Sequence, residues 1–392
     1  MRDKGNLKFD MGVENLTKYF EDFSDFEELL YGIEEFYRDH SLHVFRVYFL
    51  GSYLIREKLE GSYSGVEIMD LPTINNLTFN KYIKVSKSEK EAMWCIISLC
   101  HDLGYPLQKI NNLNEKVSKI LKYFGTYNFA RLRFSLPLEG TILDRFILEI
   151  LASKLTKISD DKFKIHIQSK YYTKYSNSYE KLNHGMMSCI LLMKNLVYFK
   201  ETDYKDKLFQ KQNSEDISYI IDAQQYLIRR EILRAVASHD CEDIYHLKMN
   251  NFLFLLIICD EIQEWNRPIF AKLLNMGMTK DKEEKILIKK FSKKKIIIVL
   301  ELAMDDSDLE KYAKSKIRKF IRLLRSAVDS YKRSFKFRMI IKNSKKLKFD
   351  FIYEKPNKNL NLDTESTYKR PIVIKTKDDE KNTDYLEEII KI

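Results

Sequence analysis

Apolar and polar side chains follow one another with the period of an α-helix over most of the chain. The stretch from Glu34 to Lys58 is mostly apolar at helical spacing, and a helix is predicted to open near Ser88, where Ser-Glu-Lys-Glu fits a capping box. Residues 107–180 also read as helices, interrupted by a loop near Pro137. The pattern therefore predicts a mostly α-helical bundle.

The pattern changes after Pro268. The run KKIIIVLELAM predicts a buried strand, and Ser307 to Lys332 predicts an amphipathic helix with a capping box at its start. Alternating apolar residues on both sides of an Asn343-Ser344 turn then predict a β-hairpin. Strand, helix and hairpin in this order indicate a small C-terminal α+β domain.

These patterns predict three parts. Residues 1–30 form a helical lead-in, residues 31–270 form the main helical domain, and residues 281–392 form the basic α+β domain. Within the main domain, residues 107–180 are expected to be a helical insertion that caps the site described below.

Composition narrows the class of protein. The chain has 392 residues, of which 44% are hydrophobic, so it can bury a sizeable core. The wholly apolar run Phe252 to Cys259 is too short to span a bilayer, and the first ten residues lack the apolar stretch of a signal peptide. Five cysteines without paired spacing favour a reducing compartment. We therefore expect a cytoplasmic protein without a membrane segment.

The formal charge of +11 is unevenly distributed. Residues 281–355 hold 23 Lys and Arg against 11 Asp and Glu, whereas the rest of the chain is close to neutral. This asymmetry predicts that the C-terminal region binds nucleic acid or another acidic partner. The alternative is compositional bias, in which lysines only solvate the surface.

His101 and Asp102 are the most informative residues for chemistry, since they follow the mostly apolar run from Met93 to Cys100. A buried carboxylate without compensation is costly, and a divalent cation bound with the help of the imidazole would compensate it. Further candidate ligands lie within or at the ends of other predicted helices: His43, His184, His239 and Asp260.

This order of residues resembles the HD-domain superfamily of metal-dependent phosphohydrolases over about residues 31–270. His43 matches the histidine of the family's first helix, His101-Asp102 the signature pair, and Asp260 the closing aspartate. His184 and His239 match the additional histidines of members with two metals. The subfamily is not resolved. Gly104-Tyr105-Pro106 lies close to the pair, whereas in the cyclic-di-GMP phosphodiesterases this motif lies well downstream. Tyr105-Pro106-Leu107-Gln108 matches the deoxynucleotide triphosphohydrolases only in part.

The resemblance implies two divalent transition-metal ions, of Mn, Fe, Zn or Ni, with Asp102 bridging them and His101-Asp102 as the catalytic pair. Arg46 and Arg267 are candidates for contacting a substrate phosphate, since the guanidinium fork fits phosphate oxygens. Alternatively, Arg46 pairs with an acid elsewhere, and Arg267 pairs with Asp260. His40 is expected either to replace His43 or to orient it through a hydrogen bond, and Glu264 to shape the rim of the pocket.

The expected function is hydrolysis of a phosphoester or phosphoanhydride bond in a nucleotide or cyclic nucleotide by a metal-activated water. Three alternatives stay open: a metal-dependent nuclease, a deoxynucleotide triphosphohydrolase acting in nucleotide balance or phage defence, and a non-catalytic nucleotide sensor.

Overall fold

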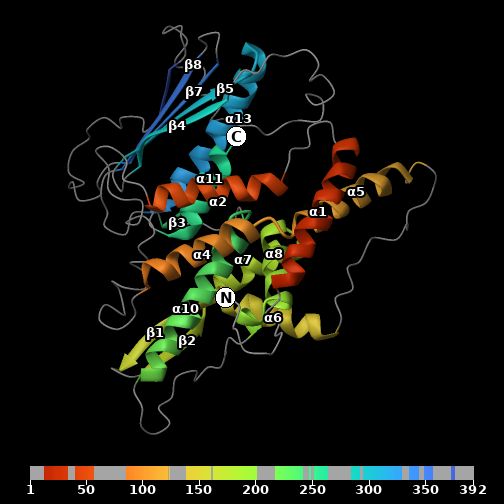
Figure 1. The fold of residues 1–392 in the computed structure, drawn as a ribbon, viewed down its shortest axis with the longest axis vertical. Coiled ribbons are helices and arrows are strands. Elements are labelled where there is room, and N and C mark those ends of the chain that lie inside the picture. The colour runs from red at the N-terminus through yellow and green to blue at the C-terminus, as the bar shows by residue number, and fades with distance from the viewer. Residues whose placement is uncertain are drawn as a thin grey trace. The chain divides into compact units, whose positions relative to one another are not determined.

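The structure is a computed structural model that divides into two compact units (Figure 1). The first unit contains residues 1–34, 40–44 and 73–244, and the second contains residues 35–39, 45–72 and 245–392. Helix α11, predicted to belong to the main helical domain, thus clusters with the second unit. The functional domains predicted from the sequence stay predictions. The structure describes residues 13–33, 40–56, 85–121, 123, 138–159, 162–200, 217–241, 247–248, 251–263, 284–291, 295–328, 335–343, 348–355 and 372–375.

Packed helices dominate the first unit, so the mostly α-helical prediction is confirmed. Helix α10 packs against α4 and α8, and α8 also packs against α5 and α6. Trp94 of α4 and Leu233 of α10 are 1% and 0% exposed, as expected for residues at the centre of such a bundle. The helices of this unit are α1 (Val13–Ile33), the start of α2 (Ser41–Arg56), α4 (Lys87–Cys100), α5 (Tyr105–Leu121), α6 (Leu138–Ala152), α7 (Ser169–Glu180), α8 (His184–Asn195), α9 (Val197–Lys200) and α10 (Ile217–Ser238).

The expectation of helices alone across residues 107–180 is wrong between α6 and α7. There, β1 (Ser153–Ser159) and β2 (Lys162–Ile167) form an antiparallel hairpin. The pairing places Leu155 opposite Ile165, and both side chains are buried. The local alternation of apolar and charged residues has the period of a strand rather than of a helix, which is the physical reason for the difference.

Helix α4 begins close to the predicted position, but its N-cap lies two residues before Ser88. Ser86 is the N-cap: its hydroxyl accepts a hydrogen bond from the Glu89 backbone, and the Glu89 carboxylate accepts one from the Ser86 backbone. The capping box is therefore Ser86 with Glu89, and the predicted capping box at Ser88 is wrong. Gln224 of α10 also donates to the Glu89 carboxylate, so the cap is tied to the bundle.

A mixed sheet with one covering helix forms the C-terminal part of the second unit. Its strand order is β4-β5-β7-β8-β9, and the β5–β7 pair is parallel with α13 in the connection between them. The predicted strand, helix and hairpin are thus present, although the helix ends at Ser326 rather than at Lys332. The elements are β3 (Leu247–Lys248), α11 (Phe252–Ile262), β4 (Lys285–Phe291), β5 (Lys295–Leu302), α13 (Asp306–Ser326), β6 (Ala327–Val328), β7 (Phe335–Asn343), β8 (Lys348–Lys355) and β9 (Ile372–Lys375).

Helix α13 buries one side against the sheet. Leu309, Ile317 and Phe320 are fully buried, and the Phe320 ring stacks on Phe337 of β7 with 5.0 Å between ring centroids. Spacing of three and four residues places these side chains on one face of the helix, as the sequence predicts. Among the described helices, none has both the length and the apolar composition needed to cross a membrane.

Candidate metal centre

The His101-Asp102 pair lies in the sharp turn that joins α4 to α5. His101 caps the carboxyl end of α4, and the Tyr105 backbone N–H donates to the Asp102 carbonyl oxygen where α5 begins. Both side chains are buried: His101 is 0% exposed and Asp102 is 6% exposed. The turn therefore carries the two residues into the interior of the first unit.

Gly104 allows this turn to lie against α8. A Cβ atom at this position would come within 2.3 Å of the His184 carbonyl oxygen. The Gly104 N–H donates to the Ser188 hydroxyl at 2.8 Å, and that hydroxyl lies 2.7 Å from the His101 carbonyl oxygen as its donor. Ser188 thus fixes the turn to α8.

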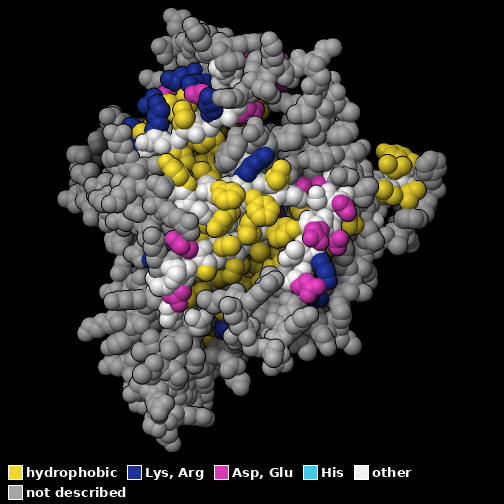
Figure 2. All heavy atoms as spheres, in the orientation of Figure 1, with side chains coloured by type: hydrophobic (Ala, Val, Ile, Leu, Met, Phe, Trp, Pro, Cys, Tyr) yellow, Lys and Arg dark blue, Asp and Glu magenta, His cyan; other side chains and the backbone are white. Residues whose placement is uncertain are grey.

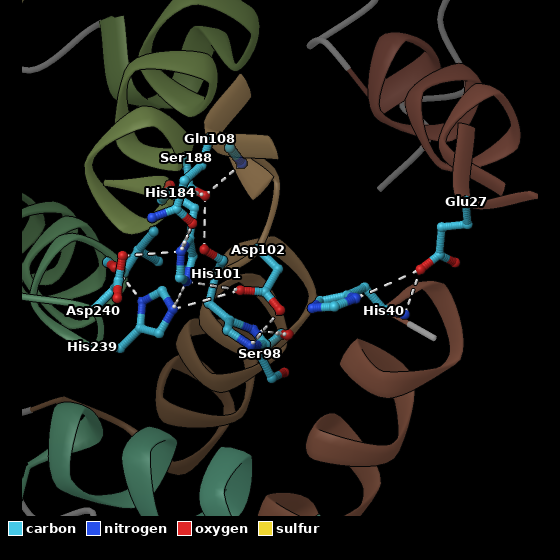
Figure 3. Close-up of polar contacts among 12 residues, drawn as sticks. Glu27, His40, Ser98, His101, Asp102, Gln108, His184, Ser188, His239 and Asp240 are labelled. Atoms are coloured by element: carbon cyan, nitrogen blue, oxygen red, sulfur yellow. Dashed lines mark hydrogen bonds and ion pairs between the residues drawn. The ribbon is translucent and has the colours of Figure 1, made fainter. Parts of the chain in front are cut away.

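Three imidazoles surround the Asp102 carboxylate (Figure 3). His101 Nε2 lies 3.4 Å from Oδ2, whereas His184 Nε2 and His239 Nε2 lie 3.3 Å and 3.5 Å from Oδ1. His184 begins α8 and His239 follows the end of α10, so three helix termini converge on one acid. The structure therefore brings together four of the residues predicted as metal ligands.

The other nitrogen of each ring is held by the protein. His101 Nδ1 donates to the Ser98 carbonyl oxygen at 2.8 Å, and His239 Nδ1 donates to the Val236 carbonyl oxygen at 2.7 Å. Because a carbonyl oxygen only accepts, both Nδ1 atoms carry the hydrogen. In the neutral ring this leaves the Nε2 lone pair toward the site, which is the orientation that a metal-binding histidine requires.

His184 is held by two polar side chains. Its Nδ1 lies 2.8 Å from Gln108 Oε1 of α5 and 2.9 Å from Asp240 Oδ2. Its Nε2 therefore faces His239 Nε2, at 2.9 Å. Two acceptor nitrogens at this distance need a proton or a cation between them or close to them.

The charge state of Asp102 agrees with this need. Burial alone would raise the pKa of its carboxyl, but the neighbouring imidazoles, His101 first and then His239 and His184, hold that pKa well below its usual value. The carboxylate is therefore ionised. One atom each from His101, Asp102 and His239 lies within 4.8 Å of the others, so imidazole nitrogens and a carboxylate oxygen together fit a divalent transition metal.

The histidines at the start of α2 lie next to this cluster. His43 is 1% exposed, and its ring centroid is 5.8 Å from that of His101. His40 stacks on Tyr105 with 3.8 Å between ring centroids. The buried Glu27 carboxylate of α1 accepts hydrogen bonds from the His40 and Ser41 backbone N–H groups and so caps α2. Glu27 thereby orients the helix turn that carries both histidines.

Helix α1, the predicted lead-in, contributes Tyr19. Its hydroxyl donates to the Leu103 carbonyl oxygen within the His-Asp turn. Burial, assisted by the negative charge of Asp102, raises the pKa of Tyr19, so the phenol stays protonated and acts as a donor. The lead-in is thus part of the structure that supports the site.

Two of the remaining predicted residues belong to the second unit. Arg46 lies on α2 and Asp260 on α11, both within the second unit and both half-buried. Their roles as a phosphate contact and as a metal ligand stay predictions. Glu264 and Arg267 lie outside the described residues.

Sequence reasoning missed the residues that hold the cluster: Glu27, Gln108, Gly185, Ser188 and Asp240. Gly185 and Asp240 each follow a predicted ligand directly, and that adjacency was the available signal. A Cβ atom at Gly185 would lie 2.6 Å from the Val236 carbonyl oxygen and 3.0 Å from His239 Nδ1, so the α8–α10 approach requires glycine there.

Comparison with known proteins finds no relative of this chain. The chain matches no protein-family model, no curated protein and no solved structure.

Proposed function

We propose that the chain is a metal-dependent phosphohydrolase that acts on a nucleotide or cyclic nucleotide. The observation that carries the proposal is the convergence of His101, His184 and His239 on the buried Asp102 carboxylate. The order of these residues along the chain, which resembles the HD-domain superfamily, supplies the reaction type and the substrate class.

The protein side chains would hold one or two divalent transition ions. His101, Asp102, His184 and His239 present the donors, and the Ser98 and Val236 carbonyls with Gln108 and Asp240 keep the imidazoles in place. A bound cation would polarise phosphoryl oxygens and acidify water, the chemistry on which hydrolysis at neutral pH depends. Asp102 would keep its charge for this purpose because its pKa is low. His43 and Asp260 are further ligands in the proposal, from sequence order.

The experiment is a turnover screen with Mn²⁺ over nucleoside mono-, di- and triphosphates, cyclic nucleotides and oligonucleotides, combined with elemental analysis of the purified protein. Asp102→Ala is compared with Asp25→Ala, an exposed acid of α1 in the same unit. We expect Asp25→Ala to match the wild type and Asp102→Ala to lose both metal and turnover. Equal metal content in the two variants, with both folded, refutes the site. If Asp102→Ala loses its metal but the wild type turns over none of the substrates, the sensor alternative is favoured.

A second candidate function is that of a metal-dependent nuclease, because the exposed side of α13 suits a nucleic-acid partner. Its exposed side carries a row of cations. Cations aligned on one helix face suit a phosphate backbone. The exposed row consists of Lys311, Arg318, Lys319 and Arg322, of which Lys319 also contacts Glu261.

A further inference from the structure

Strand β4 is an edge strand among the described strands of the sheet. It pairs with β5 on one side, in antiparallel register, and the described strands leave its other side open. The main-chain N–H and C=O groups on an open edge are a template for another extended chain. The edge extends over Lys285–Phe291, which is long enough for a short peptide.

A groove of ≈ 620 Å³ follows this edge. On one side it is lined by the consecutive residues Glu284 to Lys289, whose side chains alternate between the two faces of the sheet. A groove that touches both sets lies along the edge of the strand rather than on one face. Leu50 and Tyr53 of α2, from the same unit, form the opposite wall.

Tyr53 of this wall belongs to a row of exposed aromatic side chains on α2. Phe45, Phe49 and Tyr53 succeed one another every four residues and are 40%, 65% and 47% exposed. Figure 2 shows hydrophobic side chains gathered on the face over which α2 runs. On β4, Leu287 is 42% exposed. Exposed aromatic and aliphatic side chains in a continuous patch mark an interaction surface.

The register of the sheet indicates which side chains a strand added beside β4 would carry. Lys285 lies opposite Glu301 of β5, which in turn contacts Lys342 of β7, so charge alternates across three strands. Two residues along, the next position on the same face is apolar, with Leu287 opposite Val299. An added strand would continue the charged row of Lys285 if it placed an acid beside that lysine. It would continue the apolar row of Leu287 if it placed an apolar residue there.

From the edge, the groove and these rows we propose that β4 and α2 form a docking site for an extended acidic peptide. The peptide adds to β4 by main-chain hydrogen bonds and presents acid, apolar and acid at alternate positions toward Lys285, Leu287 and Lys289. Its opposite side chains pack against the aromatic row of α2. This proposal does not rest on the candidate metal centre or on the proposed hydrolysis.

A second copy of this chain fits the edge less well. Antiparallel self-pairing centred on Leu287 places Lys285 opposite Lys289, and like charges directly opposite each other are destabilising. The lysines at the edge therefore disfavour pairing with a second β4 strand and favour pairing with an acidic strand.

The test uses the full-length protein and a fluorescein-labelled decapeptide in which glutamate alternates with valine. Fluorescence anisotropy should show saturable binding in the micromolar range. A peptide N-methylated at every residue, which cannot donate main-chain hydrogen bonds, should bind at least tenfold more weakly. Leu287→Glu should weaken binding similarly, while Lys336→Glu, at a paired lysine on β7, should leave it within about twofold of wild type.

Charge exchange separates this site from general attraction between opposite charges. Lys285→Glu should weaken the glutamate peptide roughly fivefold to tenfold and improve binding of a peptide with lysine in place of glutamate. Lack of saturable binding at 100 μM peptide, or equal binding of the N-methylated peptide, overturns the proposal. So does a concentration-dependent dimer of the wild type that Leu287→Glu converts to monomer, since the edge would then hold a second copy. All variants are compared by thermal unfolding, and Leu287→Ser replaces Leu287→Glu if that variant does not fold.

Discussion

Asp102 is the residue on which the candidate centre depends, because the imidazole nitrogens converge on its two carboxylate oxygens. Its neighbours His184 and His239 approach each other at 2.9 Å, a distance that two neutral acceptor nitrogens do not adopt without a proton or a cation nearby. A negative charge fixed beside lone pairs is the arrangement that we propose to hold a cation.

We expect Asp102→Asn to remove activity far more completely than substrate binding. The amide keeps the shape of the side chain but loses the charge, and loss of one preorganised electrostatic group costs on the order of two decades or more in kcat. Arg46→Ala should instead raise KM with little change in kcat, because a phosphate contact of equal strength in both states affects binding alone. Steady-state kinetics of both variants, on the substrate found by screening, decide this. A kcat for Asp102→Asn close to that of the wild type places hydrolysis elsewhere.

Gly185 is a second residue with a specific expectation. Gly185→Ala introduces a methyl group against the Val236 carbonyl and the His239 ring, which α10 holds through that same carbonyl. Overpacking of this kind costs roughly 1–3 kcal/mol of folding free energy, although alanine is the better helix former. Metal affinity should fall as well, since His239 is displaced. Ser169→Ala, in an exposed position at the start of α7, serves as the control.

Chemical denaturation and metal titration of the two variants provide the measurement. If Gly185→Ala unfolds at the same denaturant concentration as Ser169→Ala and binds metal equally, the close approach of α8 and α10 is not needed.

At the scale of elements, α13 combines a buried apolar side with an exposed basic side. Its buried side fixes it to β7 and β8, so the exposed row of cations is held rigidly. Rigid presentation of several cations reduces the entropy cost of binding successive phosphates.

Charge reversal at Lys311, Arg318 and Arg322 should weaken binding of a labelled 20-nucleotide oligonucleotide. The slope of log affinity against log salt should decrease in magnitude by about 0.7–0.9 for each phosphate that the variant no longer neutralises. Reversal of Lys116, Lys119 and Lys181, exposed lysines of the first unit, changes the net charge equally and is the control. The same salt slope in both triple variants contradicts a role for α13.

The elements of this fold were predictable to different degrees. Strand β5, helix α13 and the β7–β8 hairpin have long, regular patterns, and all three are present. The β1–β2 hairpin escaped prediction because its strands are short and lie between helices α6 and α7, so the helical pattern of its neighbours dominated. Strand β4 was not predicted, because Lys285, Lys289 and Lys290 weaken its hydrophobic alternation.

For the site, helix ends bearing His101, His184 and His239 were predictable from the order of motifs, whereas the residues that orient them were not. Gln108 and Asp240 gain their role only through the packing of α5, α8 and α10, and local sequence does not encode that packing. Ser188 likewise resembles any helical serine until α8 lies beside the His-Asp turn.

At the scale of the whole molecule, buried thiols make stability sensitive to alkaline pH. Burial raises the pKa of Cys100 to about 12 and that of Cys259 well above its usual value. The folded protein therefore keeps these protons while the unfolded chain loses them above about pH 8.5. Stability is fully present below that pH and falls as pH rises toward the folded pKa, by up to about 1.4 kcal/mol per pH unit for each thiol.

Thermal unfolding under reducing conditions should therefore show a lower Tm at pH 9.5 than at pH 7.5. Cys100→Ala should reduce the slope of stability against pH, while a similar slope persists from the other thiols. The half-buried Cys95 should react with a thiol reagent before Cys100 does. Mass spectrometry of the partly labelled native protein identifies the order, and faster labelling of Cys100 contradicts the burial argument.

The Ser188 contact with the His101 carbonyl joins residues 87 positions apart, and the contact between His184 and His239 joins residues 55 positions apart. On the ribosome, His101 and Asp102 emerge long before His239, so a nascent chain has only part of the ligand set until α10 has been synthesised. An ion that binds once α10 has been synthesised would hold together the residues at both ends of these two long loops. Its binding free energy would then become part of the folding free energy of the unit. Metal supply during translation would thus set how much of the newly made protein reaches its final form.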